Sequence, residues 1–117
     1  MKNKMCKKIF TVLLALIVST MFFTVAFAVN SGDCGVDVEW YFDESSGELT
    51  ISGNDTMTDY DKAEDTPWYG FRDKILKITV SDGVSGIGRY AFNGCSNVSE
   101  INLPDSLKTI GYSAFDS

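Results

Sequence analysis

Histidine is absent from the whole sequence, and only three cysteines are present. A zinc site or a Cys–His nucleophile therefore lacks its usual partner, because an imidazole commonly supplies the metal ligand or the general base in such sites. The sequence also contains no motif typical of an activated nucleophile. We therefore expect a protein that is not an enzyme and that needs no cofactor or metal.

Basic residues are scarce beyond the first eight positions. Lys2, Lys4, Lys7 and Lys8 make up four of the ten, whereas residues 29–117 hold the other six and all sixteen acidic residues, so their net charge is 6 − 16 = −10. An acidic surface repels phosphate groups, so we expect neither nucleic acid nor anionic lipid as a partner. A solvated acidic surface is the simpler interpretation of this excess.

The first 28 residues have the parts of a secretory signal peptide. A lysine-rich head is followed by an uncharged run over residues 9–28, which ends in Ala26-Phe27-Ala28. This order predicts cleavage after Ala28 and a secreted or cell-surface protein. An uncleaved anchor is the alternative, since the run is just long enough to span a bilayer. A lipoprotein anchor is not expected, because Cys34 follows an acidic residue.

Removal of this leader leaves two cysteines, Cys34 and Cys95. Outside the cell they can form a disulfide, provided that their Cα atoms lie within about 7 Å of each other. The alternative is two small, partly buried hydrophobic residues. The sequence alone leaves both possibilities open.

Two segments, residues 77–92 and 100–115, align without gaps at an offset of 23 residues. The apolar positions that recur, which we expect to form the repeat core, are Ile78, Val80, Val84, Ile87, Phe92, Ile101, Leu103, Leu107, Ile110 and Phe115. A chance similarity of two amphipathic strands is the alternative. The matched glycines and phenylalanines favour a true repeat.

The recurring pattern predicts one coil of chain per repeat. Ile78 and Val80 alternate with polar residues, as in a strand with one buried face. The repeated glycine, Gly88 or Gly111, is expected where the backbone takes a positive φ or approaches its neighbour closely. Because one coil cannot bury its own apolar side, we expect coils to stack, with Phe92 filling the interior. With so short a chain after the leader, we expect marginal stability.

Residues 29–75 predict a β-hairpin and a short helix. Strands over residues 36–42 and 49–51 flank a turn cluster. Thr66 is a plausible helix N-cap with Pro67 as the first helical residue. Trp68, Phe71 and Ile75 would then share one helix face. We interpret this module as a cap on the first coil.

Few other residues suggest chemistry. The acidic pairs Asp43-Glu44 and Glu64-Asp65 are candidates for a glycosidase, but nothing enforces the carboxylate separation that one needs. Calcium ligands are available at Asp59, Asp61, Glu64 and Asp65, without the spacing or glycine of an EF-hand. The aromatic residues Trp40, Tyr41, Trp68 and Tyr69 can stack on sugars if exposed, but at their spacing they are more often core residues.

The repeat resembles the BspA-type leucine-rich repeat (LRR_5-like). That unit reads strand, turn, Val-x-x-Ile-Gly-x-x-Ala-Phe, then a small residue and Cys, and it is matched at residues 78–95 and 101–117. Residues 31–75 are similar to the module that often precedes such repeats. Val80-Ser81 departs from the usual Ile-Pro. The resemblance implies a β-rich α/β solenoid with short helical turns, made of a cap (29–75) and two repeats (76–117), the second incomplete. We therefore expect a short or truncated member.

The same resemblance implies a non-catalytic binding or adhesion module for protein or glycan ligands at the cell exterior. Contact with a membrane is expected only through the signal peptide before its cleavage. The alternative is a non-catalytic targeting arm or fragment of a larger secreted cell-wall enzyme.

Overall fold

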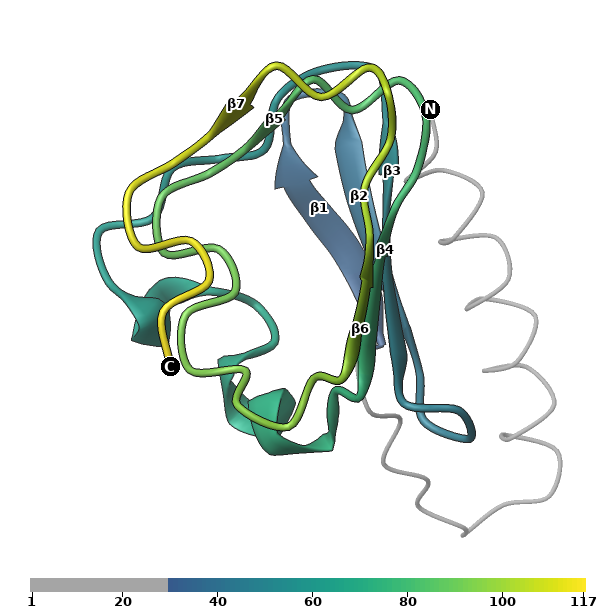
Figure 1. Cartoon of the computed structure of the whole chain (residues 1–117), viewed down its shortest axis with the longest axis vertical. Coiled ribbons are helices and arrows are strands. Elements are labelled where there is room, and N and C mark those ends of the chain that lie inside the picture. Colours follow the sequence, from purple (N-terminus) through teal and green to yellow (C-terminus); the bar gives the residue numbers. More distant parts are fainter. Residues whose placement is uncertain (1–29) are drawn as a thin grey trace, which may run out of the picture.

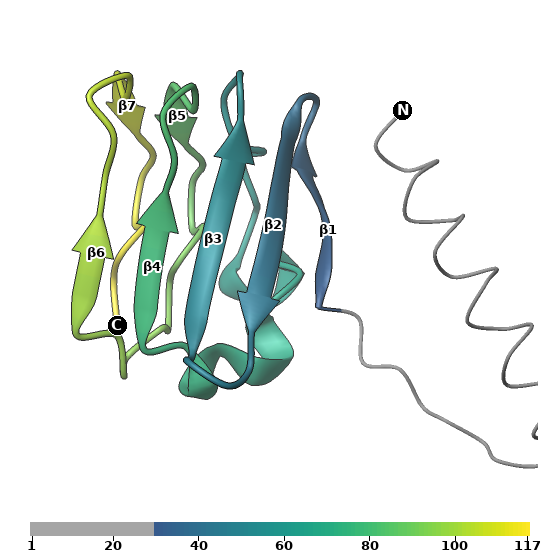
Figure 2. The same cartoon turned by 90° about the vertical axis from the view of Figure 1, so that its right-hand side faces the viewer.

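The computed structural model describes residues 30–117 (Figure 1). The predicted signal peptide, residues 1–28, lies outside this range. The described part is β-rich with little helix, as expected. It contains a five-stranded sheet in the order β1-β2-β3-β4-β6 and a two-stranded sheet of β5 and β7. Figure 2 looks onto the five-stranded sheet, with the two shorter strands beyond one end of it.

The first three strands form an antiparallel meander. Strand β2 (Val38–Asp43) pairs on one side with β1 (Ser31–Gly35) and on the other with β3 (Glu48–Gly53). The β2–β3 hairpin corresponds to the predicted one. Strand β1 was not predicted as a strand; it is short and polar, so it lacks the apolar alternation that marks a half-buried strand.

From β3 onward the sheet is parallel. Strand β4 (Lys77–Val80) pairs with β3 and with β6 (Glu100–Asn102), and Ile78 lies opposite Ile101. The offset between paired residues is 29 for β3 and β4 and 23 for β4 and β6. The second offset is the repeat period found in the sequence.

A second short ladder runs alongside the sheet. Strands β5 (Gly86–Ile87) and β7 (Thr109–Ile110) are parallel, and Thr56 makes a parallel bridge to Gly86. Within the described residues the chain therefore makes three coils, which we call coil 1 (residues 48–76), coil 2 (77–99) and coil 3 (100–117). All of coil 1 except Leu76 falls inside the stretch that the sequence assigned to a capping module, residues 29–75.

The helical segment of coil 1 differs from the prediction. The predicted short helix is present as two 3₁₀ segments, η1 (Ala63–Asp65) and η2 (Tyr69–Lys74), and does not begin at Pro67. Thr66 is not an N-cap; it follows η1, and its hydroxyl donates to the Ala63 carbonyl at 2.9 Å. Trp68 and Ile75 are buried and Phe71 packs against the core, so the three residues predicted to share one helix face all lie on the core side.

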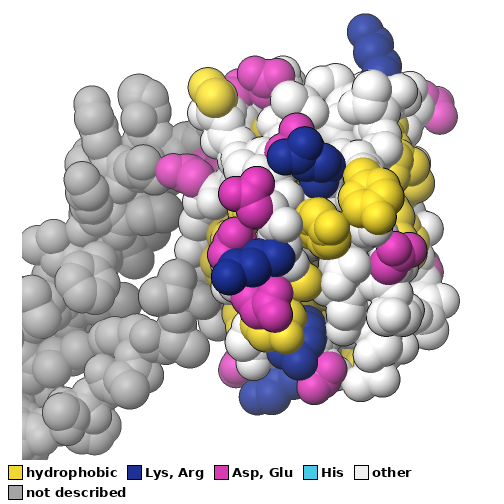
Figure 3. Space-filling view, turned by 90° about the vertical axis from the view of Figure 1, so that its left-hand side faces the viewer, with side chains coloured by type: hydrophobic (Ala, Val, Ile, Leu, Met, Phe, Trp, Pro, Cys, Tyr) yellow, Lys and Arg dark blue, Asp and Glu magenta, His cyan; other side chains and the backbone are white. Residues whose placement is uncertain are grey.

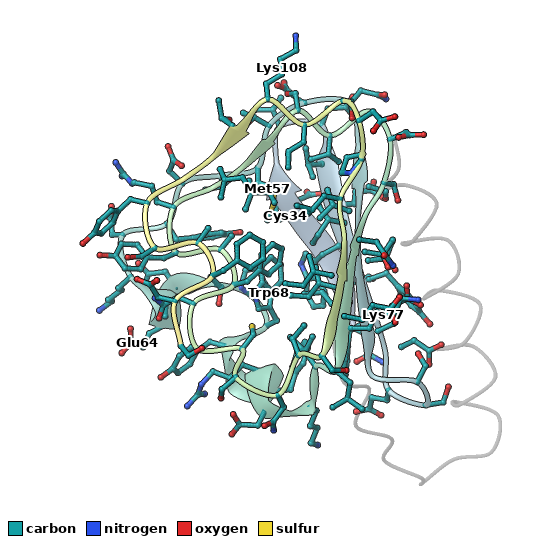
Figure 4. All side chains as sticks on the ribbon, in the orientation of Figure 1. Cys34, Met57, Glu64, Trp68, Lys77 and Lys108 are labelled. Carbon is teal, nitrogen blue, oxygen red and sulfur yellow. The ribbon has the colours of Figure 1, made fainter. Side chains whose placement is uncertain are left out.

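An aromatic stack runs through the core from coil to coil. The Trp68 ring lies against Phe92 with centroids 5.6 Å apart, and Phe92 lies against Phe115 at 5.3 Å. The buried Trp68 indole Nε1–H donates to the Ala91 carbonyl at 2.8 Å, which ties coil 1 to coil 2. Figure 4 shows Trp68, Cys34 and Met57 between the sheet and the bends opposite it.

Coil 3 is less buried than the repeat predicted. Ile101 and Leu103 are each 43 % exposed and Ile110 is 51 % exposed, whereas their counterparts Ile78, Val80 and Ile87 are buried. The prediction that these three residues form core is therefore wrong for this structure. Within the described residues, coil 2 covers only one side of coil 3. Leu107 and Phe115 are partly buried against the core.

The repeated glycine marks a close contact between coils. A Cβ added to Gly88 would lie 1.8 Å from the Thr58 carbonyl oxygen, and one added to Gly111 would lie 2.5 Å from the Arg89 nitrogen. The positive φ that we considered for these glycines occurs instead at Tyr90 (59°) and Ser113 (53°). Those two residues are again 23 apart, so the strained bend recurs with the repeat.

Candidate binding face

The five-stranded sheet has one buried side and one outer side. In β2 the side chains of Val38, Trp40 and Phe42 are buried, so those of the residues between them point to the opposite side. The register aligns outward residues of successive strands into rows. One row, which we call the central row, consists of Ser31, Tyr41, Thr50, Thr79 and Asn102.

A charged row runs next to the central row. It consists of Asp43, Glu48, Lys77 and Glu100, one from each of β2, β3, β4 and β6. In Figure 4 the Lys77 side chain points away from the core on the outer side of the sheet. Its Nζ lies 3.6 Å from the Glu100 carboxylate.

The two rows are joined by hydrogen bonds. The Thr79 hydroxyl donates to Glu48 Oε2 at 2.6 Å, and the Asn102 amide donates to Glu100 Oε2 at 3.3 Å. These contacts fix the orientation of the carboxylates while hydroxyl and amide groups stay near the surface. Such a surface can donate and accept several hydrogen bonds at the spacing of β-strands.

The four predicted aromatic candidates separate in the structure. Trp40 and Trp68 are buried core residues and pack edge to face. The Tyr69 ring lies under the Arg72 guanidinium, 3.8 Å from its carbon to the ring centroid. Tyr41 alone of the four lies in the central row, and its side chain is exposed, so its ring is available for stacking.

The acidic residues considered for a glycosidase or a calcium site are spread over the end of β2, the segment η1 and the loop before it. Asp43 ends β2, and hydrogen bonds from the Ser45 hydroxyl and backbone N–H lower the pKa of its carboxyl. Glu64 and Asp65 belong to η1. Asp59 accepts from the Arg89 backbone N–H at 2.9 Å, and Asp61 lies 3.8 Å from its guanidinium. Among residues 30–117, no three Cys, Asp or Glu side chains are grouped to hold a metal.

The two cysteines are free thiols in this structure, so the disulfide considered from the sequence is not formed. Cys34 points into the core from β1, and burial raises its pKa to about 12. Burial also raises the pKa of Cys95 to about 11. Both thiols are therefore protonated at neutral pH and are poor nucleophiles.

The side of the molecule away from the sheet has a different surface. Figure 3 shows that hydrophobic, basic and acidic side chains are interspersed there, without an area of a single charge. None of the helices in the described part of the chain could cross a bilayer, since they are too short.

Parallel strands, of which β4 and β6 pair at the same 23-residue offset as β5 and β7 in the second ladder, and aromatic residues at the following bend are together typical of a leucine-rich-repeat fold. Residues 67–117 match the family model described as "BspA type Leucine rich repeat region (6 copies)". The resemblance drawn from the sequence is thereby confirmed. Proteins of this family are usually extracellular or surface-associated, and leucine-rich repeats are typically non-catalytic.

A solved structure with the same architecture is that of a leucine-rich repeat protein from Eubacterium ventriosum. The two chains are 33 % identical, with a TM-score of 0.69, and the match covers 73 % of this chain. The chain spans 23 % of the length of that protein. A comparison with curated proteins gives no match.

Sequence reasoning identified the repeat but missed most of the outer face. The core pattern is visible because apolar residues recur every 23 positions. The central row draws residues from β1, β2 and β3, which lie outside that repeat. Only the sheet register brings Tyr41 and Thr50 into line with Thr79.

Proposed function

We propose that the chain is a secreted or cell-surface leucine-rich-repeat protein, whose coils stack as part of a solenoid and act as a non-catalytic binding module for protein or glycan ligands. The observation that carries this proposal is the central row, an unbroken line of polar and aromatic side chains across five strands. Repeat proteins commonly bind ligands over such extended surfaces.

The chemistry of the face favours an uncharged or basic ligand. Hydroxyl and amide groups can exchange hydrogen bonds with sugar hydroxyls or with a peptide backbone, and Tyr41 adds a ring for stacking. The carboxylates of the charged row and the net charge of −10 over residues 29–117 disfavour phosphate-rich partners. The ligand would be held by many weak contacts rather than in a closed pocket.

Export is the part of the proposal that rests on residues 1–28. When the full chain is produced in a bacterial host, the exported product should begin at Val29, as measured by intact mass and N-terminal sequencing. Material that stays in the membrane with Met1 intact would instead identify an uncleaved anchor.

Binding can be tested with that exported product on arrays of glycans and peptides. Tyr41→Ala and Thr50→Arg, both in the central row, should weaken binding of any ligand found by at least about tenfold, since each removes or blocks contacts at the centre of the face. Thr58→Arg is the matched control, because it adds the same charge at an exposed position off the sheet. If the central-row variants bind as well as the wild type, the face is not the binding site.

A further inference from the structure

The exposed end of coil 3 joins an apolar surface to a free strand edge. Ile101, Leu103 and Ile110 are about half exposed there, and Tyr112 is 70 % exposed. Strand β6 is the last strand of the five-stranded sheet, so one of its edges has no neighbour among the described residues. An edge strand beside exposed apolar side chains is suited to pairing with another strand.

The register shows which backbone groups face that edge. The Ser81 N–H donates to the Ile51 carbonyl at 2.8 Å, so odd-numbered residues of β4 bond toward β3 and even-numbered ones toward β6. Ile78, opposite Ile101, then bonds with the residues on either side of Ile101. The N–H and C=O groups of Ile101 itself, and of Leu103 two residues on, are directed to the free edge.

From this arrangement we infer that a second copy of this chain docks on the open end of coil 3, with the two β6 strands antiparallel about a two-fold axis at Asn102. In that register Ile101 of one copy pairs with Leu103 of the other, and the two residues exchange backbone hydrogen bonds at both ends of the strand. Their side chains point to the core side, where the exposed apolar residues of the two end surfaces meet.

The side chains on the outer side are compatible with this axis. Each Asn102 lies opposite the Asn102 of the other copy, and two amides can donate to and accept from each other. Glu100 lies opposite Pro104, so no carboxylate faces another carboxylate across the axis. All residues of coil 3 except the buried Ala114 are at least partly exposed, and their number is close to the roughly 20 residues a side of a standard interface.

The dimer would also join the two central rows. Because Asn102 is the last member of the row, the two copies continue it through the axis into a single line across ten strands. The dimer itself stands independently of the proposed function, since it forms without a ligand and is measured without one.

The first test is sedimentation of the exported product over a concentration series. The wild type should be a dimer at about 100 μM and should dissociate on dilution. Asn102→Asp places two carboxylates opposite each other and should weaken the dimer roughly tenfold. Asn54→Asp, which adds the same charge in the exposed turn after β3, should leave it unchanged.

The second test is a cysteine scan of the axis. Directly opposed residues that do not exchange backbone bonds have Cα atoms about 4.5 Å apart, within disulfide range, so Asn102→Cys should cross-link on oxidation. Glu100→Cys should not, since the two copies of residue 100 are four positions out of register, about 13 Å along the strand. Circular dichroism confirms folding of each variant, and both sites are exposed.

Three results would overturn the inference. One is a monomer at every concentration up to about 100 μM. Another is a dimer that Asn102→Asp does not weaken, or that cross-links through residue 100 instead of residue 102. The last is an open-ended series of oligomers, which would mean head-to-tail contact between coil 3 and β1.

Discussion

At the scale of single residues, the stacking depends on positions where no side chain fits. Gly88 is the clearest case, since a Cβ added there would lie only 1.8 Å from the Thr58 carbonyl oxygen of coil 1. The large aromatic residues perform the complementary role. Trp68, Phe92 and Phe115 fill the interior that the close approach of the backbones encloses.

Gly88→Ala should therefore destabilise the protein by about 2–3 kcal/mol, because the backbone of coil 1 must move to admit a methyl group. Gly70→Ala is the matched control: nothing lies within 4 Å of its added Cβ, and it should change stability by less than about 0.5 kcal/mol. Urea unfolding followed by circular dichroism measures both. Equal effects of the two substitutions would mean that the coils are not in close contact at residue 88.

The buried Cys34 thiol makes stability depend on alkaline pH. Its pKa is about 12 in the folded protein against 9.0 for an ordinary thiol, so the unfolded chain loses this proton first. The stabilising contribution is complete below pH 9 and is lost as the pH rises from 9 toward 12. Burial raises the pKa of Cys95 and of Tyr60 as well, which acts in the same direction.

Cys34→Ala removes one of these groups. The free energy of unfolding of the wild type should fall more than that of the variant between pH 8 and pH 10.5, by roughly 1–2 kcal/mol. Urea midpoints at the two pH values measure the difference. Parallel pH profiles for the two proteins would show that Cys34 is not buried as described.

At the scale of elements, the protection of backbone amides against hydrogen exchange should fall from the middle strands of the sheet to its edge strand β6. Strands β3 and β4 have neighbours on both sides, whereas β6 is an edge strand whose residues are all exposed. Amide hydrogen exchange should therefore be slowest in β3 and β4, and about 100-fold or more faster in β6 and β7. Uniform protection of all strands at low protein concentration would contradict this gradient.

The sequence predicted those elements that repeat. Coils 2 and 3 have the same offset throughout, so Ile78 could be placed over Ile101 without a structure, and the register agrees. Coil 1 was missed as a coil because its offset to coil 2 is 29, which breaks the alignment. Trp68 occupies the place of Phe92 in that coil, but a single tryptophan in an irregular loop carries no periodic signal.

Other differences have equally local causes. The short helix was expected to begin at Pro67 because Thr66-Pro67 is a common start signal, whereas Thr66 follows η1 and the second 3₁₀ segment begins at Tyr69. Burial of Ile101 was expected from the repeat pattern, which describes a residue with a coil on each side. The pattern cannot show how much of a particular coil is covered.

At the scale of the whole molecule, stability should depend on how many coil surfaces are covered. Adjacent coils bury each other's apolar residues, so an added coil contributes one more interface. Residues 95–117 can be appended directly after Ser117, because position 118 then corresponds to Cys95 at the same offset of 23. The new coil would cover Ile101, Leu103 and Ile110.

The melting temperature of this extended chain tests the stacking of coils in register most directly. It should rise by about 10 °C over that of the exported wild type, since newly buried apolar surface worth about 2 kcal/mol shifts a domain of this size by that amount. The same extension with serine in place of the added copies of Ile101, Leu103 and Phe115 should give no increase. An unchanged or lower melting temperature for the first extension, or an equal rise for both, would contradict the account.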